Sequence, residues 1–174
     1  MSPITDAPNG ILRWSVRPGR SYVLEAEGEE SGRLGFSNTG GSLARGMTAH
    51  GEWTFKREGF LHPRITVRET GTDVNCGSLS LSTNGNGKIT LSGEEFTFVT
   101  SGWLQSHWSF NRGIVEIVRF SRDGSSADVE VLNATVTPET LSVLIILGWY
   151  APLLAADEAA VIATVPSAVT AALS

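Results

Sequence analysis

The residues that most often carry catalysis are few in this chain and lie far apart along it. The three histidines are His50, His62 and His107, a spacing unlike that of a metal site, and Cys76 is the single cysteine. The sequence lacks the nucleophile elbow of hydrolases, the phosphate-binding loops of nucleotide enzymes and the paired-histidine motif of zinc proteases. We therefore expect no catalytic residue and no cofactor. A barrel enzyme with His107 or His62 in a pocket is an alternative that the sequence leaves open.

Tryptophans form the second group of side chains that could contact a ligand. Trp14, Trp53 and Trp108 alternate with other residues in a pattern typical of a core, and Trp149 lies in an apolar segment. Trp103 follows a Ser-Gly pair and precedes a polar residue, Gln105, so it is the one that we expect to be partly exposed at a rim. Beside a basic side chain it would mark a contact with a ligand or a membrane. A nucleic-acid partner is not expected, because the isoelectric point is near 5.2 and no basic cluster is interleaved with aromatic residues.

The elements that must position these residues are mostly short strands. Apolar residues alternate with polar ones between turns rich in Gly, Asn and Asp, which is the pattern of strands with one buried face. Tight hairpin turns are indicated by NGNG at 84–87 and DG at 123–124. We count about eleven or twelve strands from the alternating residues, which are Leu12, Trp14, Val16, Tyr22, Leu24, Leu34, Phe36, Trp53, Phe55, Ile65, Val67, Leu79, Leu81, Ile89, Leu91, Phe96, Phe98, Trp108, Phe110, Val115, Ile117, Phe120, Val129 and Val131.

One apolar helix is predicted near the C-terminus. Thr137 can cap its first amide groups, Pro138 suits the first helical position, and Glu139 favours the positive end of the helix dipole. Residues 141–156 then carry no charge, and apolar side chains cover every side of a 3.6-residue period. Pro152 is expected to kink this helix, because its ring meets the carbonyl of Gly148. A helix that is apolar all round must be enclosed by protein or by lipid.

Protein is the better enclosure. A membrane span needs about 20 apolar residues, whereas this run reaches only 16, from 141 to 156, before Asp157 and Glu158. All 13 Lys and Arg lie at or before Arg122, so no basic residue flanks the run to orient it in a bilayer. A closed barrel of about twelve strands leaves a lumen too wide for side chains alone, and a helix inside it would fill that space.

The fold that we predict is therefore mostly β: a closed antiparallel barrel of about twelve strands with the hydrophobic C-terminal helix threaded through it. A chain of 174 residues, 41% hydrophobic and 18% charged, suits one compact domain. We assign residues 1–10 to an N-terminal tail, 11–165 to the domain and 166–174 to a C-terminal tail. Residues 1–10 have no secretory signal pattern, so we expect a reducing, cytoplasmic location, peripheral at a membrane if it meets one.

This order of parts resembles the tubby-like superfamily, which includes the tubby C-terminal domain, the plant LURP-one-related proteins and the phospholipid scramblases. The resemblance covers about residues 11–165. The pieces that carry it are GEWTF at 51–55, GKITL at 87–91, WSF at 108–110 and the helix that begins at Thr137. It implies a non-enzymatic binding or regulatory module whose partner is an anionic phospholipid or another protein.

The tubby branch implies phosphoinositide headgroup binding through Lys and Arg on the barrel wall. The densest basic stretch here contains Lys56, Arg57, Arg64 and Arg68, and strand alternation would place Arg64 and Arg68 on one face. The simpler interpretation is a solvated strand face, because Glu58 and Glu69 lie among these residues and the formal charge of the chain is −5.

The scramblase branch implies two further features. One is an acidic calcium-associated segment ahead of the helix, which would correspond to Asp123, Asp128 and Glu130, although this stretch lacks the denser carboxylates and the aromatic positions of that pattern. Calcium needs six to eight oxygen ligands, so a polar turn is the favoured interpretation. The other feature is a C-terminal helix in the bilayer, which makes a membrane-attached protein the main alternative to a packed-helix module.

Overall fold

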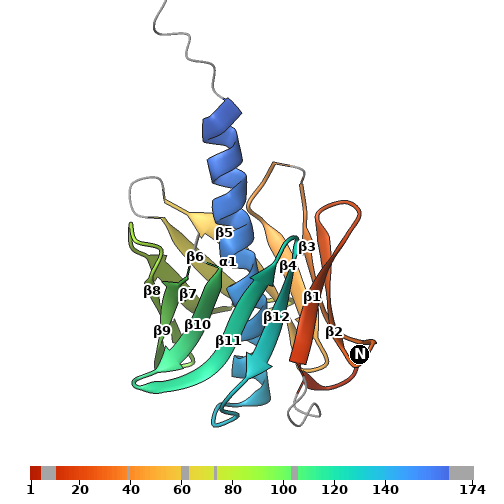
Figure 1. Cartoon of the computed structure of the whole chain (residues 1–174). Helices are drawn as coiled ribbons and strands as arrows, with labels where there is room; N and C mark the ends of the chain where they lie inside the picture. Colours follow the sequence, from red (N-terminus) through yellow and green to blue (C-terminus); the bar gives the residue numbers. More distant parts are fainter. Residues whose placement is uncertain (5–10, 39, 60–62, 73, 103–105, 165–174) are drawn as a thin grey trace, which may run out of the picture.

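The computed structural model describes residues 1–4, 11–38, 40–59, 63–72, 74–102 and 106–164. It contains twelve strands and one long helix, and it confirms the predicted fold class (Figure 1). The elements are β1 (Ile11–Arg17), β2 (Ser21–Ala26), β3 (Glu29–Phe36), β4 (Ala44–Thr48), β5 (Gly51–Glu58), β6 (Arg64–Glu69), β7 (Asn75–Leu81), β8 (Gly87–Leu91), β9 (Glu94–Ser101), β10 (His107–Arg112), β11 (Val115–Asp123), β12 (Ser126–Val131) and α1 (Pro138–Thr164).

The strands form one closed antiparallel barrel in which each strand pairs with its neighbours in sequence. Pairing of β1 with β12, for example Trp14 opposite Ala127, closes the barrel and leaves no edge strand in it. Large apolar residues point inward from each strand except β4, where the inward positions are Ala44, Gly46 and Thr48. A Cβ on Gly46 would lie 2.6 Å from Ile146, so the wall and the helix are in close contact where the sequence has no large apolar residue.

Two of the alternating valines do not reach the core. Val16 and Val115 keep 47% and 38% of their surface exposed, because each lies near an end of its strand where the barrel interior opens to solvent. The first four residues, which the sequence analysis assigned to a tail, lie against the barrel. The Ser2 amide donates a hydrogen bond to the Glu30 carbonyl (3.0 Å), and Ile4 is buried.

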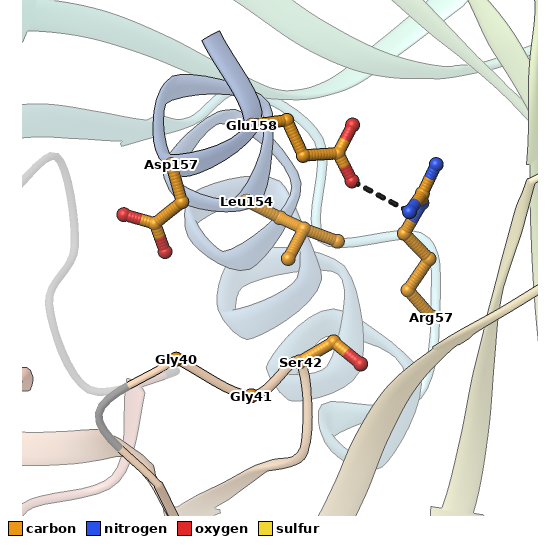
Figure 2. A pocket seen from close by; sticks show the side chains of 7 residues that line it. All are labelled: Gly40, Gly41, Ser42, Arg57, Leu154, Asp157 and Glu158. Carbon is orange, nitrogen blue, oxygen red and sulfur yellow. Dashed lines mark ion pairs between the residues drawn. The ribbon is translucent and has the colours of Figure 1, made fainter. Parts of the chain in front are cut away.

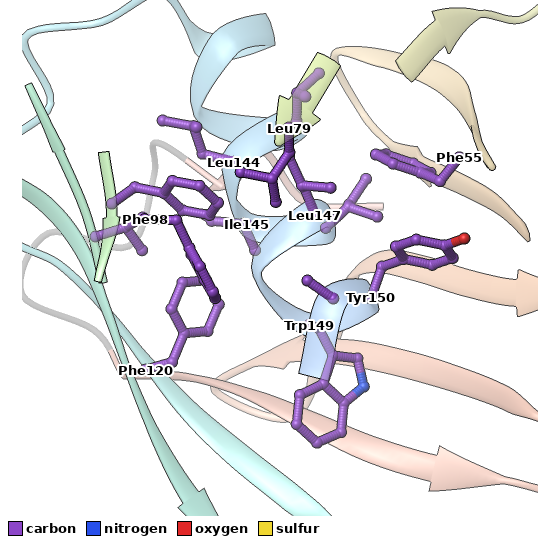
Figure 3. Close-up of a cluster of buried hydrophobic side chains, with 14 of the residues drawn as sticks. Phe55, Leu79, Phe98, Phe120, Leu144, Ile145, Leu147, Trp149 and Tyr150 are labelled. Carbon is purple, nitrogen blue, oxygen red and sulfur yellow. The ribbon is translucent and has the colours of Figure 1, made fainter. Parts of the chain in front are cut away.

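Helix α1 fills the barrel. Thr137 caps it as predicted, because its hydroxyl accepts a hydrogen bond from the Thr140 amide (3.2 Å). Residues 141–151 are buried without exception, and they pack on inward-facing strand residues such as Phe55, Leu79, Phe98 and Phe120 (Figure 3). The helix continues through Pro152 and past Asp157, well beyond the apolar run that predicted it.

One hydrogen bond explains how a proline is accommodated inside the enclosed helix. Pro152 has no amide hydrogen to donate to the Gly148 carbonyl one turn earlier. The indole of Trp108, on β10, donates to that carbonyl instead, at 2.6 Å. A buried backbone acceptor is thereby satisfied by a side chain of the barrel wall, which fixes the helix against β10.

Parallel aromatic rings surround the middle of the helix. Trp149 lies between Trp14, at 6.4 Å, and Trp108, at 6.3 Å, and Trp108 stacks in turn on Phe120 at 5.4 Å. These four rings come from β1, α1, β10 and β11, so the stack joins the helix to two separate parts of the wall. The core interpretation of Trp14, Trp53, Trp108 and Trp149 is confirmed by their burial.

Candidate functional site

Two hollows of the described structure lie at the end of the barrel from which α1 emerges, called here the mouth. One cavity of about 460 Å³ lies between the β3–β4 loop, β5 and the helix (Figure 2). A second, of about 900 Å³, lies between the β5–β6 connection, the β7–β8 turn and the helix. Glu158 of α1 lines both, and Arg57 lines the first while Arg64 lines the second. The mouth therefore brings two arginines and a helix carboxylate next to open space.

Ion pairs hold the emerging helix to the barrel. Arg57 pairs with Glu158 at 2.9 Å (Figure 2), and Arg20 pairs with the adjacent Asp157. Arg20 also donates a hydrogen bond to the Gly41 carbonyl at 3.2 Å, and its guanidinium lies 4.0 Å from the ring centre of Phe36. Each pair is partly exposed to solvent, so each stabilises the fold by less than about 1 kcal/mol. Their main effect is to fix the direction in which the helix leaves the mouth.

The four basic residues predicted to bind an anion do not form one patch. Side chains alternate along β5, so Arg57 shares the inward side with Phe55, whereas Lys56 and Glu58 point outward. Arg57 lies at the mouth, where it forms an ion pair with Glu158. The alternation that placed Arg64 and Arg68 together also separates Arg57 from Lys56, and this signal was available in the sequence.

Lys56, Arg64 and Arg68 do share one outer surface, called here the basic wall. Glu58 lies opposite Arg64 in the strand register, Lys56 lies opposite Thr66, and Arg68 follows two residues later on β6. Glu58 is 3.7 Å from the Arg64 guanidinium and 4.0 Å from that of Arg68. Three cations thus lie on the same surface as Glu58, and the other outward carboxylate of β5, Glu52, pairs with Arg45 of β4 at 2.6 Å.

Hydroxyl groups extend the basic wall toward β7. Ser80 lies opposite Arg64, and Ser78 lies opposite Thr66. The 900 Å³ cavity adjoins this region, since both Arg64 and Ser80 line it. Guanidinium, ammonium and hydroxyl donors on one surface suit the oxygens of a phosphate group. Glu69, the second carboxylate expected here, instead accepts a hydrogen bond from Thr72 (3.2 Å) at the far end of β6.

The three carboxylates considered for calcium already have arginine partners. Asp123 and Asp128 accept hydrogen bonds from Arg13 at 2.6 and 2.8 Å, and Glu130 lies 3.7 Å from Arg119. The hydrogen bond that Arg13 donates to Asp123 raises the pKa of the guanidinium, which keeps this cation charged between the two carboxylates. No group of three or more His, Cys, Asp or Glu with the arrangement of a metal site occurs in the part of the chain that the structure describes. The arrangement is that of an ion-pair network.

The other candidates do not line the mouth cavities, or they lie outside the described residues. His107 is on the surface, where its Nδ1 lies 3.0 Å from the Ser106 hydroxyl, and it is not among the residues that line the two mouth cavities. His62 and Trp103 fall outside the described residues. Cys76 is half-buried, donates to the Val67 carbonyl (3.3 Å), and has a pKa raised by burial.

Helix α1 has the length and composition to cross a membrane, but most of its apolar part is enclosed by the barrel. Among the described helices, α1 alone is long and apolar enough to cross a bilayer, over Pro138–Ala160, and 67% of its most apolar window is buried inside the barrel. Polar contacts add to this enclosure: the Tyr150 hydroxyl donates to the Ser42 carbonyl (2.5 Å), and the Thr48 hydroxyl donates to that of Ser142 (3.0 Å).

Comparisons of the chain with the models of known protein families, with curated proteins and with solved structures found no match.

Proposed function

We propose that this chain is a non-enzymatic binding module of tubby-like type, which docks on a membrane surface by recognising anionic phospholipid headgroups through its basic wall. The observation that carries the proposal is the grouping of Lys56, Arg64 and Arg68 with the carboxylate of Glu58 on one outer surface. A cytoplasmic, peripheral location is part of the proposal.

The chemistry of the wall supports an anionic oxygen ligand. Arginine donates two parallel hydrogen bonds to a phosphate, and Arg64, with 59% of its side chain exposed, has space beside it for one. Each Lys or Arg near an anionic leaflet contributes about 1 kcal/mol of attraction. Three such residues give about 3 kcal/mol before the Glu58 charge is counted, which is enough for reversible peripheral binding and too little for a permanent anchor.

The packing of α1 supports peripheral contact over insertion. Moving the helix into a bilayer would leave the barrel interior empty and would break the Trp108–Gly148, Tyr150–Ser42 and Thr48–Ser142 hydrogen bonds. Phe55, Phe98 and Phe120, which now pack around the helix, would face an empty lumen. A bound state in which the barrel stays closed around α1 avoids these losses.

The test is sedimentation of the protein with vesicles of neutral lipid alone, or of neutral lipid with phosphatidylserine or phosphoinositide, at low and high salt. We expect binding to the anionic vesicles, weaker binding at high salt, and a loss of about 30-fold in affinity when Arg64→Ala and Arg68→Ala remove about 2 kcal/mol of attraction. The matched control replaces Arg33 and Arg119 by Ala. It removes the same total charge from outward positions elsewhere on the barrel and should leave binding nearly unchanged.

Two results would overturn the proposal. Equal losses in the two double variants would mean that net charge, and not the basic wall, controls binding. No binding to any vesicle would direct the search to a protein partner.

Carbonate extraction separates peripheral from inserted protein. Protein that stays in the bilayer, and is released when residues from Thr137 onward are deleted, would favour an inserted helix.

A further inference from the structure

A second charged surface lies on β11, β12 and β1. Four outward-facing carboxylates there surround two arginines. Arg13 is shared by two of the carboxylates at 2.6 and 2.8 Å, and Arg119 by the other two at 2.5 and 3.7 Å. We call this surface the acidic wall; its carboxylates are Glu116, Asp123, Asp128 and Glu130.

The two walls have opposite imbalances. On the basic wall one carboxylate is shared by cations, whereas on the acidic wall each cation is shared by two carboxylates. Arg122, the remaining cation of β11, does not offset the acidic wall, because its guanidinium lies over the Trp108 and Trp149 rings, 5.6 and 5.8 Å from their centres. Arg17, the outward cation at the end of β1, pairs with Glu25 of β2 at 2.7 Å. The four carboxylates and two arginines of the acidic wall therefore leave two more negative than positive groups.

The barrel topology places the two walls on opposite sides of the molecule. In the closed strand order, β12 and β6 are six strands apart in either direction around twelve strands, and so are β11 and β5. Both walls cover a similar height, from the mouth, where Arg64 and Asp123 lie, toward the other end, where Arg68 and Glu116 lie. Figure 1 shows β11 and β12 on the near side of α1.

We propose that the basic wall of one copy of this chain docks on the acidic wall of a second copy. The docked surfaces differ, so the contact is heterologous, and each docked copy keeps its other wall free for a further neighbour. Because the walls are diametrically opposed, each further copy adds along the line that joins the two walls, whatever its rotation about that line. Such a contact does not close into a ring. It produces open linear assemblies.

The attraction is local and sensitive to salt. At about 0.1 M salt, charges further apart than about 10 Å are screened, so the facing walls attract while the overall charge of −5 is largely hidden. The inference does not rest on the proposed lipid function. It is compatible with that function, since a copy whose basic wall contacts a membrane still presents its acidic wall, on the opposite side, to a second copy.

Two variants neutralise one wall each. Lys56→Gln with Arg64→Gln leaves Arg68 balanced by Glu58, and Asp128→Asn with Glu130→Gln leaves two carboxylates balanced by two arginines. All four side chains lie on the outside of the barrel, so the core is untouched. The matched control, Arg33→Gln with Glu30→Gln, removes an exposed ion pair of β3 that belongs to neither wall.

The experiment is sedimentation velocity of the wild type and these variants over a range of concentrations, at about 0.1 M and about 1 M salt. We expect the average mass of the wild type and the control to rise steadily with concentration at the lower salt and to return to that of the monomer at the higher salt. Each wall variant alone should stay monomeric. An equal mixture of the two should form 1:1 dimers and nothing larger, because each variant keeps only one working wall.

Three outcomes would overturn the inference. The wild type could remain monomeric at every concentration at about 0.1 M salt. It could stop growing at a closed dimer, which diametrically opposed walls do not permit. Its association could persist when either wall is neutralised, which would assign the contact to another surface. Circular dichroism of each variant shows that the fold is retained, so that a loss of association reports on the wall.

Discussion

Replacing Trp108 by Phe tests whether the barrel wall supplies the hydrogen bond that Pro152 removes from the helix. The indole N–H donates to the buried Gly148 carbonyl at 2.6 Å, and phenylalanine has no donor. A buried acceptor left without a partner destabilises a protein by about 1–3 kcal/mol. The smaller ring also leaves a cavity, which costs about another 1–2 kcal/mol. The total expected loss in the free energy of unfolding is about 2–5 kcal/mol.

A double-mutant cycle with Pro152→Ala separates the two contributions. Alanine at 152 restores the amide hydrogen that lies one helical turn after Gly148, so the carbonyl regains a donor without Trp108. In that background Trp108→Phe should cost about 1–3 kcal/mol less than in the wild type, because only the cavity remains. For a domain of this size each kcal/mol corresponds to about 2–4 °C in Tm.

The assay is urea unfolding followed by far-UV circular dichroism, which does not depend on tryptophan fluorescence. The matched control is Trp14→Phe. Trp14 is also fully buried, but its indole nitrogen has no hydrogen-bond partner among the described residues, so its cost should be the same with Pro or Ala at 152. If Trp108→Phe costs the same in both backgrounds, within about 0.5 kcal/mol, the hydrogen bond does not replace the missing amide and the reasoning is wrong.

Three other predictions follow from the enclosed helix. Ile145→Asp would bury an unpaired carboxylate at a position with no exposed surface, which should destabilise the fold by several kcal/mol. Circular dichroism should then show little folded protein. If the helix instead lay outside the barrel in lipid-like surroundings, the β signal of the barrel would stay intact. Replacing Gly by Ala inside a helix normally stabilises it by about 1 kcal/mol. Gly148→Ala should instead lower the urea midpoint of unfolding, because the new Cβ would lie 2.3 Å from the Phe120 ring. A raised midpoint would contradict this packing. Burial raises the pKa of Tyr150, so above about pH 10 the unfolded chain loses a proton that the folded chain keeps, and the free energy of unfolding should fall as pH rises. In Tyr150→Phe this fall, measured by urea unfolding at high pH, should be shallower. Equal pH dependence of the free energy of unfolding in the two proteins would contradict the raised pKa.

Local sequence patterns predicted most of the barrel because each strand must bury one face. Pairs such as Phe96 with Phe98 identify a strand without any knowledge of its neighbours. Strand β4 was missed for the same reason, since Ala44, Gly46 and Thr48 face the core but carry little apolar surface. The absence of a side chain at Gly46 is required by the closeness of Ile146, which belongs to a helix about 100 residues later in the chain.

The candidate site was predictable only where its residues share an element or adjacent strands. Alternation along β6 correctly placed Arg64 and Arg68 on one surface. The same rule on β5 separates Arg57 from Lys56, so the four-residue site of the sequence analysis divides between the mouth and the basic wall. The Arg20–Asp157 pair had no local signal, because its partners are 137 residues apart.

The sequence by itself determined that the chain forms a β barrel around an apolar helix, because period-2 strands and an apolar helix without a polar side can only bury their surfaces in each other or in lipid. Barrel closure decided what these elements present to the outside. By pairing β1 with β12 it set β6 opposite β12, and so placed a basic and an acidic wall on opposite sides of one molecule. It also brought Trp108 to the carbonyl freed by Pro152. Such contacts depend on strand order and register over the whole barrel, which no local stretch of sequence contains.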